Sequence, residues 1–229
     1  MGDYLYLHAV FDKITWRYII KPAQMQSTNP NTNFKHIYAI TLACITWFSI
    51  GLQYYLGTGS TINFLSFFTI QCNLLIAISL TISTLSPDSK AGAFFSRLSV
   101  QSAIALYIFI VALVYNLILR GMFVLTGWHW FVDNMLHVVI PILYIAYWLF
   151  YRANGVLQWR DGIYWILYPF LYLCYSLIRG PLVQWYPYPF LHAGNLGYPT
   201  VFVNIAMVIV VFLVAGLGMI YITRSANKS

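Results

Sequence analysis

Glutamate is absent from this sequence, and charged residues of all types make up only 7% of its 229 residues. A soluble globular domain has about 25% charged residues, so this composition excludes an ordinary soluble domain, and its apolar content excludes a disordered chain. The three cysteines lie within apolar runs and show no CxxC spacing, which excludes a zinc ribbon, a redox pair and a disulfide-stapled module. With 61% hydrophobic residues and a mean hydropathy of +0.73, the composition is that of a polytopic membrane protein.

Six apolar runs are long enough to cross a bilayer, whose hydrocarbon core of about 30 Å requires roughly 20 helical residues. Because the runs are continuous rather than alternating, they predict helices and not barrel strands. We therefore expect an all-α integral membrane bundle of six transmembrane helices. Residues 1–35 are expected to form an N-terminal cytoplasmic or interfacial segment, and residues 36–224 the transmembrane domain. The predicted spans are about 36–56, 63–85, 99–121, 132–151, 162–179 and 199–222.

The basic residues predict the orientation of this bundle. All but two of the twelve Lys and Arg residues fall on the side of the two termini, and the exceptions are Arg120 and Arg179. Because cytoplasmic loops carry an excess of Lys and Arg, both termini are expected to face the cytoplasm of a bacterial inner membrane or its equivalent. The positive charge is thus explained by loops, and no nucleic-acid partner is expected.

Polar side chains at membrane depth are costly, which makes them candidates for function. Three of the predicted helices carry a pair of polar residues four positions apart, which places each pair on one helix face. Counted from the predicted helix starts at 1.5 Å per residue, the threonine and the histidine lie roughly 9 and 8 Å below the non-cytoplasmic end. We expect these pairs and Arg179 to face one cavity on that side, where His192 also lies. The pairs are Thr69 and Asn73, Asn116 and Arg120, and Asp133 and His137.

A hydroxyl and an imidazole at matched depth are suited to nucleophilic catalysis. A threonine hydroxyl is a poor nucleophile until a base takes its proton, and His137 is the candidate base for Thr69. Asp133 is a candidate to orient the imidazole ring. The asparagines, the two arginines and His192 are candidates to bind an oxyanion or a substrate carboxylate.

Each of these residues also has a structural interpretation. Thr69 can bond to its own helix, Asp133 can cap a helix, His137 can join two helices, and the arginines can reach lipid phosphates. Pro141 is expected to kink the fourth helix and free the carbonyl of His137. A metal site built from His129, Asp133 and His137, spaced i, i+4 and i+8, with His192 on the same side, remains an open alternative.

Three stretches resemble the androgen-induced protein family and its bacterial multipass relatives. They are FLSFFTIQCNLL (64–75), NMLHVVIPILYI (134–145) and WYPYPFLHAG (185–194), in this order within a six-span chain. Animal members of that family are threonine hydrolases that cleave fatty acid esters of hydroxy fatty acids within the membrane. The resemblance implies that Thr69 is the nucleophile and that His137, which precedes x3-P in the fourth span, is the base. The sequence around Thr69 is closer to the bacterial branch, and the N-terminal segment has no clear counterpart in the family.

The sequence thus predicts an intramembrane hydrolase that cleaves a lipid ester with Thr69 and His137, without a metal or other cofactor. Its substrate is expected to enter from the bilayer, beneath the loop 180–198. The alternative is a membrane protein without enzymatic activity that binds or transports a lipid or a small anion in the same polar pocket.

Overall fold

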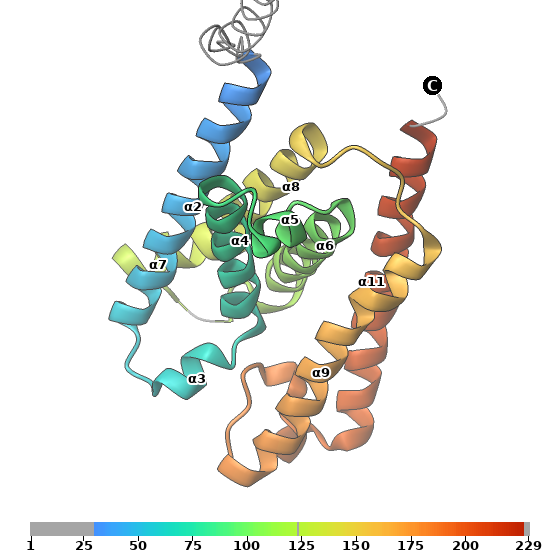
Figure 1. Cartoon of the computed structure of the whole chain (residues 1–229). Coiled ribbons are helices and arrows are strands. Elements are labelled where there is room, and N and C mark those ends of the chain that lie inside the picture. Colours follow the sequence, from blue (N-terminus) through green and yellow to red (C-terminus); the bar gives the residue numbers. More distant parts are fainter. Residues whose placement is uncertain (1–29, 123, 227–229) are drawn as a thin grey trace, which may run out of the picture. The chain divides into compact units, whose positions relative to one another are not determined.

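The structure is a computed structural model, and it describes residues 30–122 and 124–226. Every regular element within those residues is helical, which confirms the predicted all-α class (Figure 1). The chain divides into two compact units, Met1–Lys35 and His36–Ser229. Nearly all of the N-terminal segment 1–35, which the sequence predicts to be cytoplasmic or interfacial, falls outside the described residues.

Six helices of the described chain are long and apolar enough to cross a membrane, as the sequence predicts for a multipass membrane protein. These helices include two segments in which an α-helix continues into a π-helical turn. The candidate spans are Asn33–Leu56, Phe68–Leu85, Leu98–Leu119, Gly127–Tyr151, Trp159–Val183 and Tyr198–Ser225. They correspond to α2 (Pro30–Leu56), α4 (Phe68–Leu85), α6 (Leu98–Val114) with η1 (Tyr115–Leu119), α7 (Gly127–Asn134) with η2 (Met135–Val139) and α8 (Ile140–Tyr151), α9 (Trp159–Val183) and α11 (Tyr198–Ala226). The shorter helices are α3 (Thr61–Leu65), α5 (Lys90–Phe95), η3 (Pro189–Leu191) and α10 (Ala193–Leu196).

The second span begins at Phe68, so the start at residue 63 predicted from the sequence is wrong. Residues 61–65 form the separate short helix α3, which Ser60 caps by accepting a hydrogen bond from the backbone N–H of Asn63. The chain leaves the helical path at Phe67, which has an extended conformation. Thr69 therefore lies in the first turn of α4 rather than about six residues inside the span.

The fourth span begins at Gly127 rather than near residue 132, which places His137 ten residues after its start. His137 lies in the π-helical turn η2, four residues before Pro141 of the following helix α8. Because proline has no N–H to donate to the carbonyl four residues earlier, the carbonyl of His137 is left free for another donor. The side chain of Asn116 supplies that donor, with Nδ2 3.3 Å from the oxygen. The expected release of this carbonyl by Pro141 agrees with the contact.

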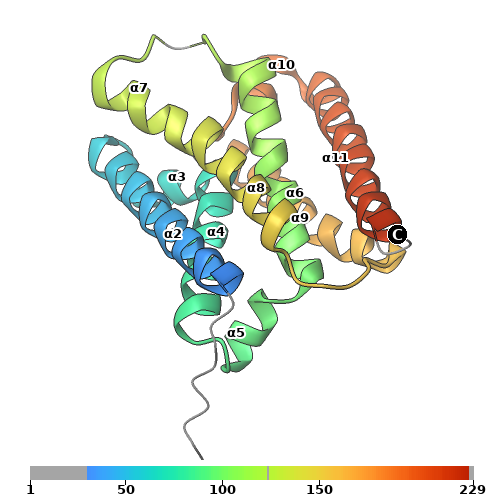
Figure 2. The same cartoon turned by 90° about the horizontal axis from the view of Figure 1, so that it is seen from above.

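The core is centred on α6, which packs against α4, α8 and α11 (Figures 1 and 2). The central part of α6 is largely buried, and Leu106 and Ile108 have no exposed surface. Trp148 of α8 donates its indole N–H to the hydroxyl of Ser102 on α6, 2.8 Å away. A buried indole N–H requires such a partner, so this contact fixes how α8 and α6 meet.

Helix α9 packs against α11 and is joined to the rest of the bundle by long polar side chains. Tyr168 donates to the side-chain oxygen of Gln71 at 2.8 Å, and Tyr172 donates to the carbonyl of Ser66 at 3.1 Å. From the other side, Tyr107 of α6 donates to the carbonyl of Trp165 at 2.9 Å. These bulky residues hold α9 away from α4 and α6, and this spacing leaves room for a cavity.

Candidate functional site

A cavity of about 200 Å³ lies between the start of α4, the end of α6, the middle of α9 and α11, and the segment after α9. Its lining is almost entirely apolar and aromatic, and hydroxyl groups come from Thr69, Tyr115, Tyr172 and Tyr188. An apolar cavity of about 150 Å³ is already large enough to hold benzene, so this space accommodates a small apolar group or part of an acyl chain. A largely apolar cavity of this kind is a candidate site for a lipid.

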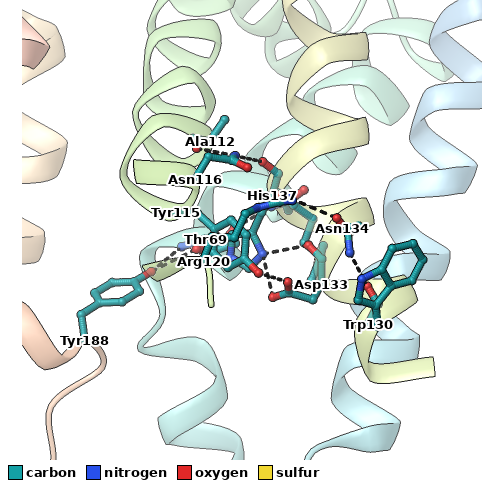
Figure 3. Close-up of polar contacts among 12 residues, drawn as sticks. Thr69, Ala112, Tyr115, Asn116, Arg120, Trp130, Asp133, Asn134, His137 and Tyr188 are labelled. Atoms are coloured by element: carbon teal, nitrogen blue, oxygen red, sulfur yellow. Dashed lines mark hydrogen bonds and ion pairs between the residues drawn. The ribbon is translucent and has the colours of Figure 1, made fainter. Parts of the chain in front are cut away.

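Thr69 lies in the wall of this cavity and is only 6% exposed. Its hydroxyl oxygen is 3.1 Å from the phenol oxygen of Tyr188, and its backbone N–H donates to the same phenol at 3.1 Å (Figure 3). The N–H groups of the first helical turn have no partner within the helix, and the residue that precedes α4, Phe67, provides no side-chain cap. Tyr188 therefore caps α4 from a distant segment of the chain.

The sequence does not single out Tyr188, because an aromatic residue in a loop between membrane spans is typical of an interfacial belt. Its ring packs edge-on against Phe67 and stacks on Phe190, at centroid distances of 5.7 and 5.3 Å. Asn204 on α11 donates to the carbonyl of Phe190 at 2.9 Å, which ties this segment to the helix pair. Burial raises the pKa of Tyr188 to about 12, although its bonds to Thr69 act in the opposite direction. The phenol is thus neutral at physiological pH.

Asp133 and His137 form a second polar group, as their spacing predicts. The Nδ1 atom of His137 is 3.1 Å from the Asp133 carboxylate and 2.9 Å from the Asp133 carbonyl oxygen. Since both neighbours accept hydrogen bonds, Nδ1 carries the proton and the neutral imidazole has its free electron pair on Nε2. The hydroxyl of Tyr115 donates to the other oxygen of Asp133, and its ring stacks on His137 at a centroid distance of 3.9 Å. The aspartate thus orients the imidazole in the manner of a catalytic triad.

Two asparagines connect these groups across the helices. Asn73, which is fully buried, donates to the carbonyls of Thr69 and Leu136, at 2.8 and 3.3 Å. It therefore joins the turn that carries Thr69 to the residue directly before His137. The side-chain oxygen of Asn73 is buried and has no hydrogen-bond partner among the described residues. Asn116, in the π-helical turn η1, donates to the carbonyls of Ala112 and His137, at 2.7 and 3.3 Å.

Thr69 and His137 are brought near one another but are not bonded. Within the described chain no hydrogen bond joins their side chains, and Nε2 of His137 has no hydrogen-bond partner there. Tyr115 contacts both places, because it lines the cavity together with Thr69 and its ring stacks on the imidazole of His137. We predicted that the two residues lie close together from the expected starts of the second and fourth spans, and both of those starts were wrong. The contact of Asn73 with Leu136, rather than that calculation, shows that the two segments are neighbours.

The remaining candidates are divided between two places. Arg120 donates to the side-chain oxygen of Asn134 at 3.1 Å and lies over the ring of Tyr115, so it belongs to the group around His137. Arg179 donates to the side-chain oxygen of Asn63 at 2.6 Å and lies over Trp185. His192 accepts a hydrogen bond from the backbone of Asn195 and packs on Tyr186. Of the site residues predicted from the sequence, all of which lie in the described chain, Thr69 alone lines the cavity. His137, the two arginines, the two asparagines, Asp133 and His192 are not among its lining residues.

Among the described residues, no three His, Cys, Asp or Glu side chains gather in the way a metal ion requires. His129 is exposed, while the Asp133 carboxylate is bonded to His137 and Tyr115. Comparison with protein-family models, with curated proteins and with solved structures finds no match for this chain.

Proposed function

We propose that the protein is an intramembrane lipid ester hydrolase in which Thr69 is the nucleophile and His137 the general base. The observation that carries this proposal is the position of Thr69, in the wall of an apolar cavity and next to a segment that bears an Asp-oriented imidazole. An apolar enclosure with a few convergent polar groups is the common form of a small-molecule site.

The proposed reaction proceeds through an acyl-enzyme. Oγ1 of Thr69 attacks the ester carbonyl as its proton passes to Nε2 of His137, and the carbonyl electron pair moves onto the oxygen. Collapse of the tetrahedral intermediate breaks the ester bond, and the alcohol leaves with the proton from His137. Water, activated by the same imidazole, then releases the acid and restores Thr69. Asp133 stabilises the imidazolium that forms in each half-reaction.

The reaction requires His137 to come within hydrogen-bond reach of Thr69 once an ester is bound. Catalytic hydrogen bonds are often long without substrate and tighten in the complex. The ring of Tyr115 is the side chain whose movement would join the two groups, because it contacts both the cavity and the imidazole.

The resemblance to the androgen-induced protein family supports a fatty acid ester of a hydroxy fatty acid as the substrate type. The acyl chain would enter from the bilayer, since lining residues of α9 and α11 remain accessible, with Phe170 56% and Ile209 45% exposed. The distribution of Lys and Arg supports cytoplasmic termini and a site on the non-cytoplasmic side of a bacterial inner membrane or its equivalent. Arg120 would bind the carboxylate of such a substrate near the site.

The test compares hydrolysis of a long-chain hydroxy fatty acid ester by purified wild type, Thr69→Ala and His137→Ala. Matched controls are Thr46→Ala, another buried threonine on a membrane helix, and His129→Ala, an exposed histidine. We expect both site variants to lose activity and both controls to keep it. Full turnover by a folded Thr69→Ala variant would contradict the proposal.

A second function, lipid binding without chemistry, is favoured by one observation. The Thr69 hydroxyl is already paired with a neutral phenol, which does not act as a base at physiological pH. A protein that only binds lipid would retain an acyl chain but would not react with a long-chain fluorophosphonate. Labelling of Thr69 by that reagent, abolished in Thr69→Ala, would exclude this second function.

A further inference from the structure

We propose that Tyr188 is a catalytic residue of this hydrolase, whose phenol O–H donates a hydrogen bond to the oxyanion that forms when Thr69 attacks the ester. This inference rests on the proposed function and adds to it a residue that the sequence did not indicate.

The first support is the location of the phenol oxygen. It is 3.1 Å from the backbone nitrogen of Thr69 and 3.1 Å from Oγ1 of the same residue. An ester carbonyl attacked by Oγ1 would place its oxygen beside that N–H group. The first turn of an 18-residue helix is also a favourable place for negative charge, because its N–H groups have no partner within the helix and the helix dipole is positive there.

The second support is that the phenol must yield this position to a substrate. Tyr188 now accepts the hydrogen bond from the Thr69 N–H, so an incoming carbonyl oxygen replaces the phenol oxygen as the acceptor. The displaced hydroxyl, still beside the same atoms, can then donate to the new oxygen. Two donors, the backbone N–H of Thr69 and the phenol O–H, would thereby form an oxyanion hole.

The third support is the way in which the phenol is held. Contacts with Phe67 and Phe190 restrict the ring from two sides, and Asn204 anchors the segment. Burial keeps the phenol protonated, so it is available as a donor throughout the physiological range. Once the carbonyl has replaced the phenol beside the Thr69 N–H, a donor held between these side chains stabilises the developing charge with little further reorganisation during the reaction.

The role leaves the proton balance of the reaction unchanged. As the bond between Oγ1 and the carbonyl carbon forms, the π electron pair moves onto the carbonyl oxygen and the threonine proton moves to His137. Tyr188 keeps its proton and only donates a hydrogen bond to that oxygen. When the intermediate collapses, the electron pair returns to the carbonyl and the hydrogen bond weakens.

The first experiment removes one oxygen atom with Tyr188→Phe and compares it with Tyr186→Phe, a change in the same segment, away from Thr69. Loss of one oxyanion donor lowers kcat by about 10²- to 10³-fold, so we expect a fall of that size for Tyr188→Phe with little change in KM. The same variant should bind a long-chain trifluoromethyl ketone, which forms a charged adduct with Thr69, about 10²- to 10³-fold more weakly. Tyr186→Phe should match wild type in both measurements.

A second variant keeps the test valid if Tyr188→Phe does not fold. A trifluorinated tyrosine incorporated at position 188 retains the size and the hydroxyl but ionises at much lower pH. We expect it to introduce a loss of kcat on the alkaline side that wild type does not show, because an ionised phenolate has no proton to donate. An alkaline profile identical to that of wild type would overturn the role of Tyr188.

The outcomes separate the two proposals. If Thr69→Ala is inactive while Tyr188→Phe keeps wild-type kcat and ketone affinity, the role of Tyr188 is wrong and the hydrolase stands. If wild type fails to hydrolyse the ester, or Thr69→Ala hydrolyses it equally well, the hydrolase proposal fails and the role of Tyr188 fails with it.

Discussion

Gly180 determines where the segment that carries Tyr188 can lie, and its substitution by alanine gives a sharp prediction. Gly180 is buried near the end of α9, and its carbonyl accepts the backbone N–H groups of Gln184 and Trp185. A Cβ atom placed on Gly180 would overlap the ring of Tyr186. Of the three ring atoms nearest to it, the farthest, Cδ1, would be only 2.5 Å away.

The magnitude follows from this overlap. Carbon atoms in contact normally lie about 3.5–4.0 Å apart, so the Tyr186 ring would have to retreat by at least about 1 Å. The Tyr186 ring also packs on His192, at a centroid distance of 4.7 Å, so its movement would disturb the rest of the segment. Forcing extra volume into a packed site typically costs about 1–3 kcal/mol. We expect Gly180→Ala to lower the free energy of unfolding by that amount and to reduce activity by displacing Tyr188.

A double-mutant cycle in detergent isolates this contact. Gly180→Ala should destabilise wild type but not a Tyr186→Ala background, in which the overlapping ring is gone, leaving a coupling of about 1–3 kcal/mol. Gly218→Ala is the control, because a Cβ there meets nothing within 4 Å, and it should be neutral or slightly stabilising. Equal destabilisation by Gly180→Ala in both backgrounds would refute the reasoning.

Four further predictions concern individual hydrogen bonds of the site and the core, and the pKa of Tyr188. Asp133→Asn should lower kcat because His137 loses the carboxylate that orients it. The expected loss is about 10²- to 10⁴-fold, the usual contribution of an acid–base group. Unchanged kinetics in a folded variant would contradict this prediction. Asn73→Leu should change the free energy of unfolding by less than about 1 kcal/mol, since the two lost hydrogen bonds are offset by removal of an unpaired buried oxygen. The same variant should nevertheless hydrolyse the ester more slowly. Trp148→Phe should destabilise the protein by up to about 1.7 kcal/mol through loss of a buried hydrogen bond while hydrolysis continues at the wild-type rate. Because burial raises the pKa of Tyr188 to about 12, deprotonation begins only far above neutral pH, and kcat measured from about pH 8 to about pH 10 should remain flat.

The helical class and the six spans were predictable because a bilayer of fixed thickness selects apolar runs of fixed length. The start of the second span was not, because the interruption before Phe68 depends on partners far along the chain. Ser66 bonds through its hydroxyl to Tyr175, 109 residues away, and through its carbonyl to Tyr172. No local signal distinguishes such a serine from one inside a helix, so the predicted helix ran through it.

One contact of the candidate site could be predicted from the sequence and another could not. The pairing of Asp133 with His137 was predictable, because four residues of helix bring their side chains together. The partnership of Thr69 with Tyr188 was not, since it spans 119 residues. It depends on a segment whose position is set by the absence of a side chain at Gly180 and by packing on Phe67. A depth counted along a helix assumes a regular helix with a known start. It fails here because the second span begins later than predicted and the fourth begins earlier and contains a π-helical turn.

The most direct test of the account is to trap the acyl-enzyme. Wild-type protein is mixed with a chromogenic long-chain ester, quenched in acid within milliseconds to seconds, digested and examined by mass spectrometry. We expect an added acyl mass on the peptide that contains Thr69, absent from Thr69→Ala and accumulating slowly in His137→Ala. Ester hydrolysis with no adduct in the wild type, or an adduct on another residue that persists in Thr69→Ala, would contradict it.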